Sequence, residues 1–236
     1  GQYVERGASA ESPSSLAARA ATAALADAGV TGLARAIDTI AVVRFFSDSS
    51  PLWTCAFGRS NNPPQSIARD IGANPRQGIY TEVGGNQPQS RLIEFARDIA
   101  LGERELVLFA GAEAIRNQRQ AERRGTTLDW NEEFEVPLDD RGIGADLFTS
   151  QEIHNGLVMP VYFYTLVEQA RASAAGRSTA QQRAHSAELM ASFSAVAATN
   201  PYAQFAGAQS AQEILAAAPM THLYTRRMVA QDGVNQ

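Results

Sequence analysis

Two glycines and an asparagine, Gly84-Gly85-Asn86, lie where an expected strand leads into an expected helix. Glycine has no Cβ, so the backbone at such a turn can approach a ligand closely. The amide groups at the start of a helix favour negative charge. Together they could stabilise an oxygen atom that gains negative charge during a reaction. A steric need for a tight turn explains the two glycines equally well, and both interpretations stay open.

Glu82 and Glu113 are candidate acid and base groups, since each comes at the end of an expected strand. A glutamate in such a place also commonly accepts hydrogen bonds from nearby backbone amides. Spacing along the chain does not by itself bring the two carboxyl groups together. We therefore assign no catalytic residue and no metal ligand from the sequence.

Among the three histidines, His154 is the best placed for ligand binding, because it precedes an expected helix that starts at Pro160. A histidine there is often only a cap or turn residue. His185 is expected on the surface, and His222 lies in a turn with no evident partner. The only cysteine, Cys55, is expected to be a small buried hydrophobe, since a reactive thiol needs surroundings that lower its pKa.

The glycine turn would be positioned by a strand, a helix and a second strand. Between Arg91 and Leu101 the apolar residues recur at helical spacing, which predicts a buried face, and Gly102 ends the helix. The unbroken apolar run from Leu106 to Ala110 is typical of a strand covered on both faces. This order predicts a βαβ crossover in a parallel sheet, and hence an α/β fold. The predicted inner face comprises Leu92, Ile93, Ala96, Ile99 and Ala100, and the outer face Arg91, Glu94, Arg97 and Asp98.

The remaining chain alternates helical patterns with polar connections. Further helices are expected from Pro13 to Gly29 and around 66–71, 115–124, 160–174 and 179–198, and a strand over 37–43. In the last two helices the expected inner residues are Val161, Tyr164, Leu166, Val167 and Ala170, then Leu189, Phe193, Val196 and Ala197. Residues 130–146 are acidic, rich in glycine and expected to be irregular.

Composition excludes several classes of function. The 236 residues carry a formal net charge of -5, which argues against binding to nucleic acid. One cysteine allows no internal disulfide, and no apolar stretch approaches the length of a membrane span. A cytoplasmic location is the expectation.

Two segments resemble the thiolase superfamily. Gly102-Glu103, the apolar strand and Ala110-Gly111-Ala112-Glu113-Ala114 are similar to its helix ending in Gly-Glu and its strand ending in Gly-Gly-x-Glu. The segment Asn200-Pro201-Tyr202-Ala203-Gln204-Phe205 resembles the Asn-Pro-Tyr-Ser-Gln-Phe of sterol-carrier-protein-type thiolases. Ser210 to Leu215 is similar to the Ser-x-x-Glu-[Ile/Val] segment that comes next in those thiolases. The resemblance spans roughly residues 12–232.

This resemblance implies a protein of the acetyl-CoA acetyltransferase family that binds acyl-CoA, with coenzyme A as part of the substrate and no other cofactor. It implies acyl transfer or C–C cleavage on the thioester. At the position of the family's nucleophilic cysteine, however, this chain has Gly85 within the turn Gly84-Gly85-Asn86. The implied acyl-CoA-binding candidates are His154, Met159, Pro160, Asn200 and Tyr202. The alternative is a non-catalytic thiolase-fold scaffold or interaction subunit.

The resemblance also implies a layered αβα fold of which this chain is one half, with a mainly helical loop domain. Residues 1–114 would form the amino-terminal βαβ core and 115–222 the loop domain. Residues 223–236 would lead into a last core strand that is absent. We therefore expect a fragment of a longer protein, which partners a second thiolase half or forms a homo-oligomer.

Overall fold

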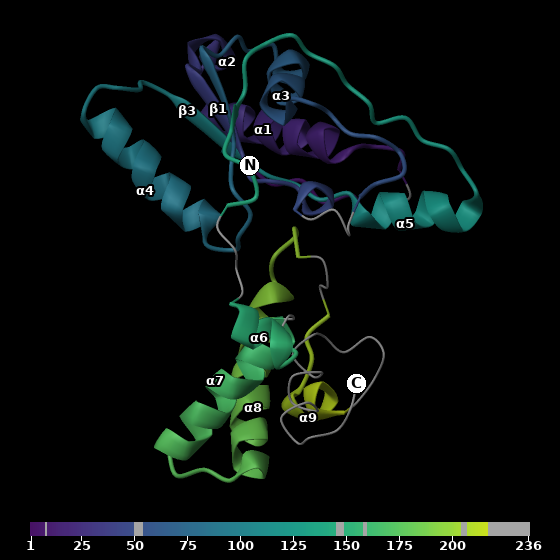
Figure 1. Ribbon diagram of the computed structural model, residues 1–236, viewed down its shortest axis with the longest axis vertical. Helices are drawn as coiled ribbons and strands as arrows, with labels where there is room; N and C mark the ends of the chain where they lie inside the picture. Colours follow the sequence, from purple (N-terminus) through teal and green to yellow (C-terminus); the bar gives the residue numbers. More distant parts are fainter. Residues whose placement is uncertain (8, 50–53, 145–148, 158–159, 204–206, 217–236) are drawn as a thin grey trace. The chain divides into compact units, whose positions relative to one another are not determined.

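The computed structural model describes residues 1–7, 9–49, 54–144, 149–157, 160–203 and 207–216 (Figure 1). The chain divides into two compact units, Gly1–Ala145 and Asp146–Gln236. Each unit buries apolar residues of its own.

A four-stranded parallel sheet forms the centre of the first unit. Its strands are β1 (Thr39–Val42), β2 (Gln77–Tyr80), β3 (Val107–Ala110) and β4 (Asp139–Asp140), in the order β3-β1-β2-β4. Thr39 of β1 is in register with Gln77 on one side and Val107 on the other. The mixed α/β fold with a parallel sheet is the one predicted from the sequence.

Helices α1 (Pro13–Ala28) and α3 (Pro63–Ile71) cover one face of this sheet, as Figure 1 shows. Small residues of α1 pack on Ile40 and Val42 of β1, which are fully buried. Both helices begin with a capped turn, because Ser12 and Asn62 each accept a hydrogen bond from a first-turn amide. The short elements α2 (Leu33–Ala36) and η1 (Phe46–Asp48) precede and follow β1.

Helix α4 (Gln87–Ala100) covers the opposite face, where Phe95 packs on Ala41, Ile79 and Phe109. The prediction for its buried face is wrong. Leu92, Ile93 and Ile99 are 58%, 61% and 45% exposed, whereas Gln87, Phe95 and Asp98 are buried. The physical reason is that α4 turns its polar side, together with Phe95, toward the sheet. Strand β3 is accordingly only half-buried, not covered fully on both faces.

Asp98 can lie inside because Arg104 neutralises it. The Arg104 Nε donates to Asp98 Oδ2 over 3.0 Å, and its Nη1 donates to Thr39 and Gln77 over 2.6 and 2.8 Å. The hydrogen bond from Arg104 holds the pKa of Asp98 below its ordinary value. A polar network therefore joins α4 to the amino ends of β1 and β2.

The first unit extends beyond residue 114. Helix α5 (Ile115–Arg124) buries Asn117 and Ala121, and the Trp130 Nε1 donates to Ala10 O over 2.7 Å. Strand β4 lies in a segment that was expected to be irregular, and it pairs with β2. The functional division into a core of residues 1–114 and a loop domain of 115–222 stays a prediction.

The second unit is helical, with α6 (Ser150–His154), α7 (Pro160–Ala174), α8 (Thr179–Ala197) and α9 (Ala211–Leu215). Ser178 caps α8 with a complete capping box, as expected. The predicted inner faces of α7 and α8 are wrong where their side chains are described, which leaves out Val161, because buried residues on these helices are small or polar. They include Ala172, Gln182, Ser186 and Ala187, whereas the exposed apolar residues include Tyr164, Leu166, Val167, Leu189, Phe193 and Val196.

Within the part of the chain that the structure describes, no helix is long and apolar enough to cross a membrane.

Candidate functional site

The candidate site is the turn between β2 and α4. Gly84 has φ +148°, and a Cβ placed there would come within 2.5 Å of the Asn86 Oδ1. A Cβ at Gly85 would meet nothing within 4 Å, and this residue is exposed. The conformation therefore requires glycine at position 84, whereas position 85 has room for a side chain.

The amino end of α4 is uncapped. Asn86 makes no side-chain capping hydrogen bond, in contrast to Ser12 at the start of α1. Gln87 N donates to Gly84 O over 3.1 Å and Ser90 N donates to Asn86 O over 3.0 Å, which closes the turn. A helix start without a side-chain cap favours an acceptor oxygen supplied from elsewhere.

A network of ion pairs lies next to this turn in the sequence and on helix α4. Arg91 forms an ion pair with Glu94 on the same helix. Arg141 donates two hydrogen bonds, of 2.9 and 2.7 Å, to the carboxylate of Glu94. The Glu82 Oε2 lies 3.9 Å from the Arg91 Nη1. These side chains are at most 28% exposed, so the network is largely shielded from water.

A second polar cluster follows β1. The Tyr80 hydroxyl donates to Asp48 Oδ2 over 2.6 Å and accepts from Phe45 N over 2.9 Å, and Arg59 donates to Asp48 over 2.8 Å. Burial and the neighbouring Asp48 carboxylate raise the pKa of Tyr80 above its ordinary value. Tyr80 is therefore a hydrogen-bonding group here and not an ionising one.

Glu113 lies at the end of β3 and accepts a hydrogen bond from Phe46 N over 2.8 Å. Partial shielding of its carboxyl group from water, in a residue that is exposed as a whole, and the nearby Asp48 raise the pKa of Glu113 to about 7. Glu82 follows β2, and β1 lies between β2 and β3. Because a strand separates them, the two glutamates do not form an acid/base pair.

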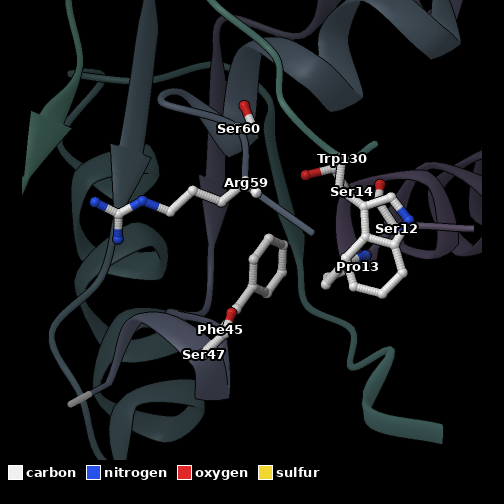
Figure 2. Close-up of a pocket in the computed structure, with 9 residues that line it drawn as sticks. Ser12, Pro13, Ser14, Phe45, Ser47, Arg59, Ser60 and Trp130 are labelled. Carbon is white, nitrogen blue, oxygen red and sulfur yellow. The ribbon is translucent and has the colours of Figure 1, made fainter. Parts of the chain in front are cut away.

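A small crevice opens at the amino end of α1 (Figure 2). The side chain of Arg59 extends across it, with the guanidinium on the side away from Trp130. The crevice contains none of the site residues predicted from the sequence. Its lining comprises Ser12, Pro13, Ser14, Phe45, Ser47, Gly58, Arg59, Ser60 and Trp130.

The acyl-CoA-binding candidates belong to the second unit. His154 is the exposed last residue of α6, and Asn200 and Tyr202 are exposed and joined by a 2.9 Å hydrogen bond from Tyr202 N to the Asn200 Oδ1. Met159 lies outside the described residues, and Pro160 begins α7. Their role in binding stays a prediction.

Cys55, expected to be buried, is only half-buried, whereas His185 lies on the surface as expected. Burial raises the pKa of the Cys55 thiol, which disfavours a reactive thiolate. His185 is exposed, and His222 lies outside the described residues. No group of His, Cys, Asp and Glu side chains in the described ranges could hold a metal ion.

Gln87 and Arg91 are site residues that sequence analysis missed. The signal was present, because Gln87, Arg91, Glu94 and Asp98 recur at helical spacing and form a continuous polar stripe. The sequence analysis places Arg91, Glu94 and Asp98 on the outer face, since polar residues usually face water, and it makes no prediction for Gln87.

No protein-family model matches the chain, and no curated protein matches it. Among solved structures, the chain is similar to a monomeric SCP2-thiolase-like protein type 1 from Mycobacterium smegmatis, with 33% sequence identity and a TM-score of 0.63. The match covers 93% of this chain and 38% of that protein, so this chain spans well under half the length of that protein. The chain thus has a thiolase-like fold, and the match supports the thiolase-like superfamily indicated by the sequence.

Proposed function

We propose that this chain is the acyl-CoA-binding amino-terminal half of a thiolase-like protein of the acetyl-CoA acetyltransferase family. It acts in acyl transfer or C–C cleavage on a CoA thioester without the usual nucleophilic cysteine. In this proposal residues 1–114 form the core and 115–222 a loop domain that contributes His154, Met159, Pro160, Asn200 and Tyr202 to binding, and the protein is cytoplasmic. The similarity to an SCP2-thiolase-like protein supports the choice of family.

The observation that carries the proposal is the uncapped start of α4 behind the turn at Gly84 and Gly85. Both acyl transfer and C–C cleavage place negative charge on the thioester oxygen in the transition state. Backbone amides at a helix start can stabilise that charge without any thiol. The exposed, open position of Gly85 leaves room for the thioester at this point.

The test is a calorimetric titration of the protein with acetyl-CoA and with a longer acyl-CoA. We expect micromolar binding of both, and a loss of about tenfold in Gly84→Val, because the turn can no longer keep its conformation. Gly72→Val is the matched control, since Gly72 also has a positive φ but ends α3. No binding by the unaltered protein, or equal losses in both variants, would contradict the proposal.

The alternative, a non-catalytic scaffold or interaction subunit, is favoured by one observation. The apolar side of α4 is exposed over Leu92, Ile93 and Ile99, which is unusual for a helix beside a sheet. A second thiolase half or a second copy of the chain would cover it. Intact-mass and sedimentation measurements on the native protein distinguish these partners, and association without acyl-CoA binding would favour the scaffold.

A further inference from the structure

An open cavity of about 380 Å³ lies at the amino ends of β1 and β2. The glycine turn follows the carboxyl end of β2, so the cavity and the turn lie at opposite ends of these parallel strands. A volume of this size is within the range of small-molecule sites. Every residue of the lining is polar or charged, namely Asp38, Thr39, Arg76, Gln77, Glu103 and Arg104.

Two guanidinium groups of this lining are joined by a chain of contacts. The Arg76 Nη2 lies 3.7 Å from the Asp38 Oδ2, and the Thr39 Oγ1 donates to the Asp38 Oδ1 over 2.6 Å. The Arg104 Nη1 in turn donates to the Thr39 Oγ1 over 2.6 Å. Asp38 and Thr39 are only 8% and 2% exposed, so buried groups hold this part of the cavity in place.

Both guanidinium groups still have N–H groups to offer. The Nε and Nη1 of Arg104 are used within the protein, whereas its Nη2 donates to no described residue. The Arg76 guanidinium makes no hydrogen bond within the described part of the chain, because 3.7 Å to Asp38 is too long for one. A carboxylate is an acceptor that suits such N–H groups, since guanidinium and carboxylate form charge-assisted hydrogen bonds.

A negative charge lines the same cavity. Glu103 is adjacent to Arg104 and exposed, and its carboxylate has neither an ion pair nor a hydrogen bond among the residues that the structure describes. Asp38, in contrast, already accepts hydrogen bonds from the amides of Glu105 and Leu106. The cavity thus offers both free cationic groups and a free anionic group. A ligand of one sign would meet a like charge there, whereas a zwitterion pairs with both signs.

We propose that this cavity is a binding site for a small zwitterion with a carboxylate and an ammonium group, such as a free α-amino acid. The carboxylate accepts hydrogen bonds from Arg76 and from the Nη2 of Arg104, and the ammonium group pairs with Glu103. This site goes beyond the proposed function and does not depend on it, because no lining residue belongs to the glycine turn or to the acyl-CoA-binding candidates.

The test is a calorimetric titration of the protein with L-alanine, propionate and ethylamine. Propionate is alanine without its ammonium group, and ethylamine is alanine without its carboxylate. We expect a dissociation constant of about 1 mM for alanine and values about tenfold higher for the other two, since each of them loses one charged contact. Equal dissociation constants for the three compounds, or no binding of alanine, would overturn the site.

Variants of the two free charges assign the contacts. Arg76→Gln should weaken alanine binding about tenfold and leave ethylamine binding unchanged, whereas Glu103→Gln should weaken alanine binding and leave propionate binding unchanged. Both residues are exposed, so both variants should fold. The matched controls, Arg35→Gln and Glu105→Gln, change exposed residues outside the lining and should leave all three dissociation constants unchanged. Unchanged alanine binding in the first two variants, or equal losses in the controls, would overturn the assignment.

Discussion

Helices α1 and α4 lie on opposite faces of one sheet, but α1 packs its apolar side on the sheet whereas α4 turns its apolar side away from it. Helix α1 buries Leu16, Ala17 and Ala21 against the core and begins with a capped turn. Helix α4 buries Gln87 and Asp98, exposes Leu92 and Ile93, and begins without a side-chain cap. Helix α1 therefore has both a capped start and a covered apolar side. Helix α4 has an apolar side that nothing in the described residues covers and a start without a side-chain cap.

This difference shows that an apolar stripe at helical spacing can either pack on the sheet, as on α1, or remain exposed, as on α4. An apolar stripe stabilises a fold only where another layer covers it. On α1 that layer is the sheet of the same unit. On α4 the sheet contacts Phe95 and the polar stripe, so the apolar stripe is available to a partner.

The largest expected effect comes from exchanging one leucine on each helix. Leu16→Ala should lower the free energy of unfolding by about 2–4 kcal/mol, because three buried carbon atoms are lost and a cavity remains. Leu92→Ala should change it by about 0.5 kcal/mol or less, since Leu92 is exposed. Urea unfolding measures both. A large loss in Leu92→Ala would mean that a partner covers α4 in the native protein.

The next largest change in stability is expected in the turn before α4. Gly84→Ala should destabilise by about 1–2 kcal/mol, because φ +148° strains any residue with a Cβ. Gly85→Ala should stay within about 0.5 kcal/mol, since its Cβ would enter open space. Thermal unfolding of the two variants provides the comparison. Equal losses would contradict the conformations described for this turn.

Removing the side chain at each helix start should give a smaller difference in the free energy of unfolding. Ser12→Ala should cost about 1 kcal/mol, because the Ser12 hydroxyl accepts a 3.1 Å hydrogen bond from Ser15 N. Asn86→Ala should cost about 0.5 kcal/mol or less, since Asn86 makes no capping bond. The free energies of unfolding from denaturant titration measure this pair, and a cost for Asn86 that matches Ser12 would show that α4 is capped after all.

The smallest effect concerns acid stability. Arg104 lowers the pKa of Asp98 in the folded state. The ionised Asp98 therefore adds to the free energy of unfolding above about pH 4, and this stabilisation is lost as the pH falls through the folded-state pKa. Asp98→Asn should therefore flatten the fall in melting temperature below about pH 4. Asp27→Asn, an exposed aspartate on α1, is the control and should leave that fall unchanged. An unchanged slope in Asp98→Asn would show that the network with Arg104 contributes nothing to folding.

Local signals in the sequence predicted much of the fold. Ser12-Pro13 and Ser178 marked helix starts, and Gly29 and Gly102 marked helix ends, because caps and left-handed glycines depend on the residue type itself. The order of apolar strands and amphipathic helices predicted the parallel sheet. The turn at Gly84 was predicted for the same reason, since only glycine adopts its backbone conformation without strain.

The burial of α4 and the separation of Glu82 from Glu113 were decided by the tertiary structure. A helical pattern shows that two sides of a helix differ, but it does not show which side meets the sheet. Here Arg104, six residues beyond Asp98, neutralises that carboxylate and allows the polar side to face inward. Strand order likewise placed β1 between the two glutamates. Residue types alone determined the turn and the caps, whereas contacts between distant segments decided which polar groups surround the turn.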